Sequence, residues 1–171
     1  MTYEKLPVWI DTQEQLTALI ATLRGAERIG IDTEFHGERT YIPRLMLLQL
    51  ATEEDIYLVD PLAELDLCAL FTAIAAPDGP LVIGHALRND LEIVYLRCGT
   101  VLPRLFDTQI AGAFLGFGLQ VGLSNLVAKV CDEGLPKDGQ MADWSRRPLS
   151  EKLCTYAAND VRYLLQLHTK L

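Results

Sequence analysis

The chain has 171 residues, half of them hydrophobic, and a formal net charge of −8 at pH 7. This is the usual length of one domain with a single sizeable core, and the acidic balance argues against a protein that grips long stretches of nucleic acid through a broad basic surface. No apolar run approaches the roughly 18 to 20 residues needed to span a bilayer, and the N-terminus lacks the pattern of a signal peptide. We therefore expect a cytoplasmic protein that does not enter a membrane.

The N-terminal third predicts a helix followed by three strands. Thr12 and Gln15 fit a capping box, and apolar residues recur at helical spacing after them, so residues 12–24 should form an amphipathic helix that ends at Gly25. Three β-like runs follow, at residues 28–35, 45–51 and 56–59. We expect them to be neighbouring strands.

Helices and strands alternate in the rest of the chain. Helical patterns lie at 64–75, 87–97, 108–115, 122–131 and 150–168, and strand patterns lie at 81–84 and 105–107. This order predicts an α/β architecture, a mixed sheet flanked by helices, and no repeat or linker marks a second domain. Residues 132–149 have no regular period, and long irregular loops in compact domains are often functional.

The four cysteines are widely separated in the sequence, at Cys68, Cys98, Cys131 and Cys154. They form no C-x-x-C pair and have no nearby histidine cluster that would indicate a zinc site. In a cytoplasmic protein this pattern predicts reduced, buried thiols.

Two carboxylates end the first strand, at Asp32 and Glu34. Side chains two apart on a strand point to the same face, so these two converge. Such anions repel one another unless a cation or protons intervene, and hard oxygen ligands suit Mg²⁺ or Mn²⁺. Alone the signal is weak, because an acid at a strand end is more often part of a turn or a helix cap.

Two further acidic positions lie on predicted helices. Asp90 falls near the start of the helix at 87–97, where an acid also stabilises the helix dipole. Tyr156 and Asp160 are four apart on the last helix, which places them on one face, although they could also be a hydrogen-bonded structural pair.

Together these segments resemble a known family. D-T-E-F, H-x-x-x-x-D and Y-x-x-x-D occur in order on a strand, a strand-to-helix junction and the last helix, and the segments 39–45, 48–50, 107–109 and 143–150 agree as well. The chain resembles the ribonuclease D group of the DEDD exonucleases, in the subclass with tyrosine in the third motif, along nearly its whole length. The resemblance implies a ribonuclease H-like fold, a mixed sheet of five or six strands flanked by helices, as one 3′-5′ exonuclease domain over residues 1–171.

The resemblance also implies a chemistry. Asp32, Glu34, Asp90 and Asp160 match the acidic ligands of two divalent metal ions, Mg²⁺ or Mn²⁺, and Tyr156 matches the tyrosine that positions the attacking water. The expected reaction is hydrolysis of RNA from a free 3′ end to nucleoside 5′-monophosphates, in the maturation or decay of tRNA precursors or other structured RNAs. Family members commonly continue into helical HRDC domains, and we expect none in this chain.

The sequence signals for substrate contact are weaker than those for the acidic residues. The set comprises Thr33, Phe35, His85, Lys137 and Arg147. Phe35 could stack on a base or belong to the core, and a lone histidine such as His85 is more often structural. Further candidates for phosphate contact are Arg39, Arg44, Arg146 and Arg162. The alternative is that these cations are ordinary solvated surface charges, which we expect to hold for about half of them.

Two other functions fit the same residues. One is an exonuclease that acts on DNA, which a requirement for the ribose 2′-OH would distinguish. The other is a nucleic-acid-binding module without catalysis, against which the complete acidic set argues. The sequence leaves the oligomeric state open.

Overall fold

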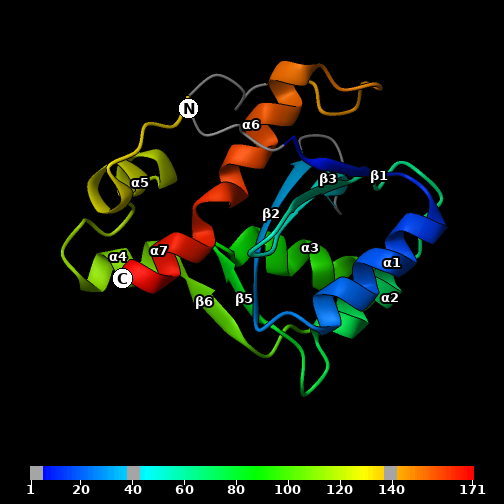
Figure 1. The fold of residues 1–171 in the computed structure, drawn as a ribbon, viewed down its shortest axis with the longest axis horizontal. Helices are drawn as coiled ribbons and strands as arrows, with labels where there is room; N and C mark the ends of the chain where they lie inside the picture. The colour runs from blue at the N-terminus through cyan, green and yellow to red at the C-terminus, as the bar shows by residue number, and fades with distance from the viewer. Residues whose placement is uncertain (1–5, 38–42, 137–141) are drawn as a thin grey trace.

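A mixed sheet forms the centre of the molecule (Figure 1), and the computed structural model describes residues 6–37, 43–136 and 142–171. The strands described are β1 Val8–Ile10, β2 Arg28–His36, β3 Arg44–Ala51, β4 Ile56–Val59, β5 Leu81–Gly84 and β6 Leu105–Asp107. Their order in the sheet is β1-β4-β3-β2-β5-β6. The strand β2 is antiparallel to β3 and parallel to β5, so it is the centre of the sheet. The predicted mixed sheet is confirmed with six strands in the described residues; β1 was not predicted, because three residues are too few for an alternating pattern.

Helices cover both faces of this sheet. They are α1 Gln13–Arg24, α2 Leu67–Ile74, α3 Arg88–Cys98, α4 Thr108–Phe114, α5 Leu123–Cys131, α6 Glu151–Arg162 and α7 Leu164–Lys170. The capping box predicted at Thr12 is present, with Gln15 as its partner. No helix in the described ranges is both long enough and apolar enough to cross a membrane.

The two faces of β2 pack against different helices. Ile29 and Ile31 point into the largest core cluster, together with side chains of α1, α2 and α3. Gly30 lies between them and faces the other side, where a β-carbon would meet Leu164 and Leu165 at 3.3 Å. Glycine therefore allows α7 to approach the strand closely, and α6 packs over β2, β3 and β4 on this same side.

The last predicted helix is two helices. A turn at Tyr163 separates α6 from α7. The helix α6 packs over β2, β3 and β4, whereas α7 packs against β2, β5 and α5. A sheet twists, so one straight helix cannot follow both regions, and a break in the helix lets each half pack on its own strands.

The expectation of reduced, buried thiols is wrong for two cysteines. Cys68 of α2 and Cys98 of α3 form a disulfide, with their α-carbons 5.3 Å apart. The packing of α2 against α3 brings these residues together although 30 positions separate them, a contact that sequence spacing does not reveal. Cys131 is a buried free thiol, and Cys154 is a partly exposed one.

Candidate active site

Asp32 and Glu34 project from the same face of β2, the face that α6 covers. Their cross-strand neighbours on β3 are Gln49 and Leu47, both fully buried. Thr33, between them, points to the opposite face. The strand thus presents two carboxylates side by side at the edge of a buried surface, as the sequence predicts.

The helix α6 brings the third carboxylate to this face. It begins at Ser150, whose hydroxyl accepts a hydrogen bond from the backbone of Leu153, and its apolar side buries Ala157 and Val161 on the sheet. Asp160 then lies beside the strand, where one oxygen from each of Asp32, Glu34 and Asp160 falls within 4.8 Å of the others. Tyr156 is one turn earlier on the same side of the helix.

Asp90 approaches from the other side of β2. It lies in the first turn of α3 and is 7% exposed, and the hydroxyl of Thr33 donates a hydrogen bond to its Oδ1. Its charge raises the pKa of Asp32 and of Glu34, so it belongs to the same electrostatic cluster. Thr33, expected to contact substrate, is thus the hydrogen-bond partner of Asp90.

The electrostatics of the cluster strongly disfavour four bare carboxylates. Burial raises the pKa of Glu34 to about 8, of Asp160 to about 7 and of Asp90 to about 6, and for Glu34 the nearby charges of Asp160 and Asp90 add to the effect. The pKa of Asp32 is raised well above its ordinary value, first by burial and then by the charges of Asp90, Asp160 and Glu34. Bound cations would reverse these shifts, because they make the ionised form favourable.

The donor set fits hard divalent cations. The converging oxygens of Asp32, Glu34 and Asp160, with Asp90 adjacent, are the type of ligand that Mg²⁺ and Mn²⁺ prefer. Buried carboxylates without such a partner are uncommon, because proteins seldom bury unpaired charge.

Asp107 has a role that the sequence did not reveal. Its Oδ1 accepts hydrogen bonds from the backbone N–H groups of Ala86, Gln109 and Ile110, and its Oδ2 accepts one from Leu87. Ala86 has a positive φ of 61°, and α3 has no side-chain cap at its own N-terminus. Asp107 therefore holds the turn that starts α3, the helix that carries Asp90. The sequence feature that could have indicated this role is the position of Asp107 at the end of a strand beside β5.

His85 serves the same region as a structural residue. Its Nε2 is 2.9 Å from the carbonyl oxygen of Val121, and since a carbonyl only accepts, this nitrogen carries the proton. Burial lowers the pKa of His85, which favours the neutral ring, and Nδ1 lies 2.9 Å from the hydroxyl oxygen of Thr108, whose proton is also donated to the carbonyl oxygen of Gly84. Both ring nitrogens are occupied, which leaves none for a substrate contact in this arrangement.

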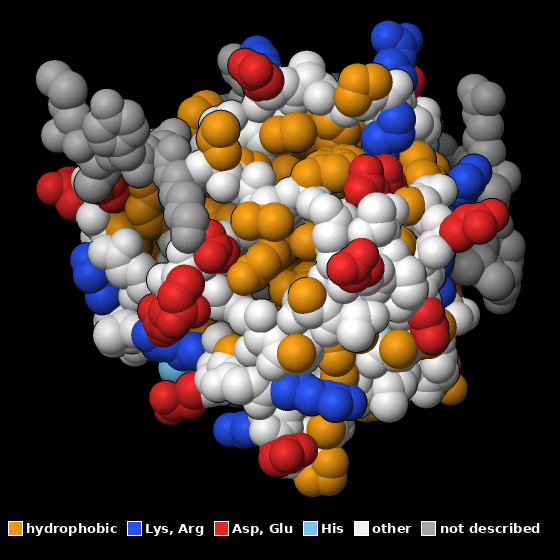
Figure 2. Space-filling model, turned by 45° about the vertical axis from the view of Figure 1, so that its right-hand side comes forward, with side chains coloured by type: hydrophobic (Ala, Val, Ile, Leu, Met, Phe, Trp, Pro, Cys, Tyr) orange, Lys and Arg blue, Asp and Glu red, His pale blue; other side chains and the backbone are white. Residues whose placement is uncertain are grey.

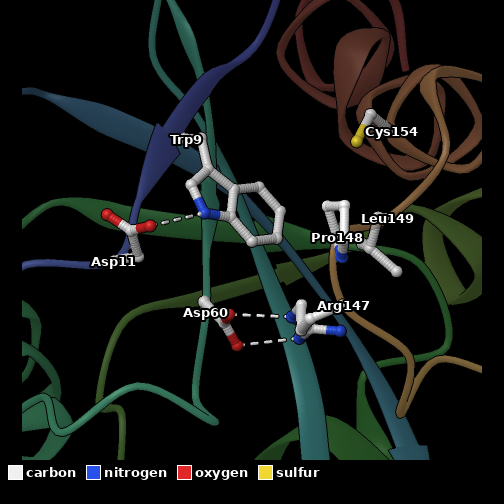
Figure 3. A pocket seen from close by; sticks show the side chains of 7 residues that line it. All are labelled: Trp9, Asp11, Asp60, Arg147, Pro148, Leu149 and Cys154. Carbon is white, nitrogen blue, oxygen red and sulfur yellow. Dashed lines mark hydrogen bonds and ion pairs between the residues drawn. The ribbon is translucent and has the colours of Figure 1, made fainter.

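Arg147, another predicted substrate contact, pairs with Asp60 (Figure 3), and all five of its N–H donors are engaged within the protein. Two bind the carboxylate of Asp60, each at 2.7 Å, and three bind the backbone carbonyls of Met46, Trp144 and Arg146. The guanidinium also lies 5.6 Å from the ring centroid of Trp9. A phosphate would have to displace one of these bonds.

The remaining candidates for substrate contact are aromatic and basic residues. Phe35 is half-buried against the core cluster of α1, α2 and α3, beside an irregularity in the β2–β3 pairing. Lys137 and Arg39 lie outside the described residues. Trp144, an aromatic residue of the irregular loop at 132–149, is a core residue whose ring centroid is 6.1 Å from that of Tyr156.

The class of protein follows from this fold and a family match. Residues 7–171 match the family described as "3′-5′ exonuclease", so the chain belongs to that family, as its motifs predict. The acidic cluster on β2, α3 and α6 lies within the matched residues.

Individual relatives narrow the comparison to ribonuclease D. The chain is 46% identical over 167 residues to ribonuclease D of Xanthomonas oryzae pv. oryzae, an alignment that covers 97% of this chain and 45% of the relative. The solved structure of Escherichia coli RNase D, "an exoribonuclease involved in structured RNA processing", superposes with a TM-score of 0.91 at 36% identity, covering 97% of this chain and 44% of that one. The catalytic core of RRP6 from Trypanosoma brucei gives a TM-score of 0.88 at 28% identity, with 98% and 46% covered. The chain thus spans less than half the length of these relatives.

Proposed function

We propose that this chain is the catalytic domain of a 3′-5′ exoribonuclease that releases nucleoside 5′-monophosphates one at a time. The observation that carries the proposal is the convergence of Asp32, Glu34 and Asp160 within 4.8 Å, with Asp90 buried beside them, in a chain of the 3′-5′ exonuclease family. The similarity to ribonucleases D supports RNA as the substrate. The role of the E. coli enzyme in structured RNA processing supports structured RNAs such as tRNA precursors.

The four acids would hold two divalent ions, Mg²⁺ or Mn²⁺. When bound, such a pair lowers the pKa of the attacking water and stabilises charge on the scissile phosphate and the leaving 3′ oxygen. The protein's own contribution is to bring four carboxylates to one place from a strand and two helices. Thr33 and Asp107 support this geometry, the first by its bond to Asp90 and the second by holding the start of α3.

Tyr156 orients the attacking water and does not take its proton. Burial and the charges of Asp160, Glu34 and Asp32 raise the pKa of its hydroxyl above the ordinary value of 10. The phenol therefore stays protonated at neutral pH and acts as a hydrogen-bonding group. His85 is no alternative base, because its Nε2 donates to the carbonyl oxygen of Val121 and its Nδ1 faces the hydroxyl of Thr108.

Digestion of a 5′-labelled RNA oligomer and a DNA oligomer of matched sequence tests the proposal. With Mg²⁺ or Mn²⁺, we expect a ladder that shortens by single nucleotides on RNA, no reaction in a chelator, and survival of the same RNA made circular. Asp32→Asn should abolish the reaction while the protein remains folded by circular dichroism, because a neutral amide is a poor ligand for two cations. Internal cleavage of the circular RNA would contradict an exonuclease. A faster reaction on the DNA oligomer would show that DNA is the preferred substrate.

A further inference from the structure

A second hollow lies between the start of β3 and α3, the helix that carries Asp90. It measures about 240 Å³ and is lined by Pro43, Arg44, Leu45, Ile93 and Arg97. Leu45 and Ile93 are 2% and 3% exposed, so they form a fixed apolar floor. Arg44 and Arg97 are exposed and contribute the charge.

The register of the sheet and the pitch of the helix place this hollow close to the active site. Arg44 pairs with His36, two residues beyond Glu34 on the adjacent strand. Asp90, Ile93 and Arg97 follow one another at helical spacing, so the acid and the arginine share one side of α3, about 10 Å apart along its axis. A strand that enters the active site can therefore continue over the hollow.

Neither guanidinium has a carboxylate partner among the described residues. In that part of the chain, Arg44 and Arg97 form no ion pair, whereas Arg28, Arg146 and Arg147 do. In a chain of net charge −8, Coulomb attraction would ordinarily pair each of these guanidinium groups with a carboxylate. Their charge is therefore available to an anion that lies beside the active site.

The position of Arg97 is also constrained. The next residue, Cys98, is tied to Cys68 of α2 by the disulfide, and the Sγ of Cys68 lies 3.9 Å from the carbonyl oxygen of Arg97. The end of α3 is thereby anchored to α2, which fixes the backbone position from which the Arg97 side chain extends.

We propose that Arg44 and Arg97 bind a phosphodiester of the substrate strand on the 5′ side of the scissile linkage. The inference rests on the proposed function, since the strand remaining after each cleavage lies on that side of a 3′-terminal nucleotide. A guanidinium presents donors in a planar fork that matches phosphate oxygens, and the apolar floor suits the sugar or base edge that flanks them. The larger hollow in Figure 3, about 410 Å³, is a poorer candidate because its Arg147 has no free donor.

Substrate length provides the first test. We compare wild type with Arg44→Gln, Arg97→Gln and the double variant on a dinucleotide, which has only the scissile linkage, and on a longer single-stranded RNA. The KM for the longer RNA should rise roughly five- to tenfold for each arginine removed, with kcat and the dinucleotide reaction unchanged. The slope of log kcat/KM against log salt should become shallower by about 0.7 for each lost contact.

Arg24→Gln is the matched control. Arg24 is an exposed arginine in the last turn of α1, before the start of β2, and so lies at the opposite end of that strand from Glu34. The substitution removes the same charge from the same acidic protein and should leave the KM unchanged. An equal rise in KM for Arg24→Gln would show that the KM depends only on the net charge of the protein. It would overturn the proposal that Arg44 and Arg97 bind a phosphodiester.

Chemical change in the RNA provides a test that does not depend on how the variants fold. Neutral methylphosphonate linkages, placed one at a time on the 5′ side, should slow the wild type several-fold at one linkage and should add nothing to the defect of the double variant. Equal effects in both proteins, or no linkage with an effect, would overturn the proposal. If inorganic phosphate inhibits the wild type but not the double variant and no linkage matters, the hollow binds free phosphate and not the strand. A wild type that releases no nucleotide from any RNA would instead refute the proposed function.

Discussion

At the scale of single residues, Tyr156 shows how surroundings determine a role. Its ring packs near Trp144 at a centroid distance of 6.1 Å, which restricts its rotation, while its hydroxyl lies in the field of Asp160 and Glu34. An ordinary tyrosine is already a weak acid, and this setting holds its proton more tightly. The side chain is suited to holding a water molecule in place.

Tyr156→Phe should therefore lower kcat by roughly 10² to 10⁴ with a smaller effect on KM, because a positioning hydrogen bond acts mainly in the transition state. Single-turnover kinetics on labelled RNA and metal titration by calorimetry measure the two quantities. Metal affinity should stay within a few-fold of wild type. If metal binding is lost instead, Tyr156 is a ligand or a structural residue.

Asp107 is the corresponding example outside the acidic cluster. Asp107→Asn keeps the shape of the side chain but leaves only one oxygen to accept hydrogen bonds, so one of the backbone groups at the start of α3 or α4 loses its partner. We expect unfolding to become easier by about 1 to 2 kcal/mol and kcat/KM to fall about tenfold, because Asp90 is less well placed.

The control for this variant is Asp66→Asn, which weakens the cap of α2, where Asp66 accepts from the backbone of Ala69. Urea denaturation should give a comparable loss of stability, and the activity should be unchanged. Equal activity losses in the two variants would mean that Asp107 acts only through general stability.

At the scale of elements, α2 and α3 act as one unit. They pack together, and the disulfide between Cys68 and Cys98 closes a loop of 30 residues that contains β5 and most of α3. Such a link restricts the unfolded chain, so its effect on stability is expected to be large relative to any single contact.

Replacing both cysteines by serine should lower the free energy of unfolding by roughly 3 kcal/mol, as the loop length implies. Reduction of the wild type should have a similar effect in urea denaturation and should change nothing in the double variant. Cys154→Ser is the control, since this thiol is free. A wild type insensitive to reductant would show that the thiols are not linked in solution.

At the scale of the whole molecule, four of the 23 acidic residues meet at the active site, and the others are distributed over the rest of the chain. On the face drawn in Figure 2, Lys and Arg side chains are interspersed with Asp and Glu and form no continuous basic surface in the described part of that face. A net charge of −8 then favours contact with a few phosphates near a terminus over an extended track.

The site acids also make stability depend on pH when metal is absent. Their pKa values in the folded protein are raised, to about 8 for Glu34 and about 7 for Asp160, from ordinary values of 4.5 and 3.8. Between these limits the folded state binds more protons than the unfolded state, so stability falls as pH rises. This is opposite in sign to the effect of a salt-bridged carboxylate.

In a chelator, we therefore expect the free energy of unfolding to fall by several kcal/mol between about pH 4 and pH 8. Mn²⁺ or Mg²⁺ should remove most of this decline, because bound cations favour the ionised acids. Asp160→Asn should reduce the slope in the chelator. A metal-free protein whose stability rises steadily across this range would contradict the raised pKa values.

Local spacing in the sequence was enough to predict most elements, whereas the resemblance to the ribonuclease D motifs was needed to single out the four acidic residues. The spacing of two between Asp32 and Glu34 and of four between Tyr156 and Asp160 defines a shared face through local geometry alone, and the structure confirms that Asp32, Glu34 and Asp160 converge. The predicted strands and all but the last helix agree with the structure for the same reason, since their periodicity is local.

Tertiary packing, by contrast, determines which of the remaining groups are free to act. The sequence favoured Arg147 as a phosphate contact, but Met46, Asp60 and its own loop engage all of its donors. Arg44, also a candidate from the sequence, lines a hollow with Arg97, and neither has an ion-pair partner in the described chain. The disulfide between Cys68 and Cys98 likewise depends on how two helices pack. Such contacts join residues far apart in the chain, and their partners follow from the packing of whole elements, which no local spacing encodes.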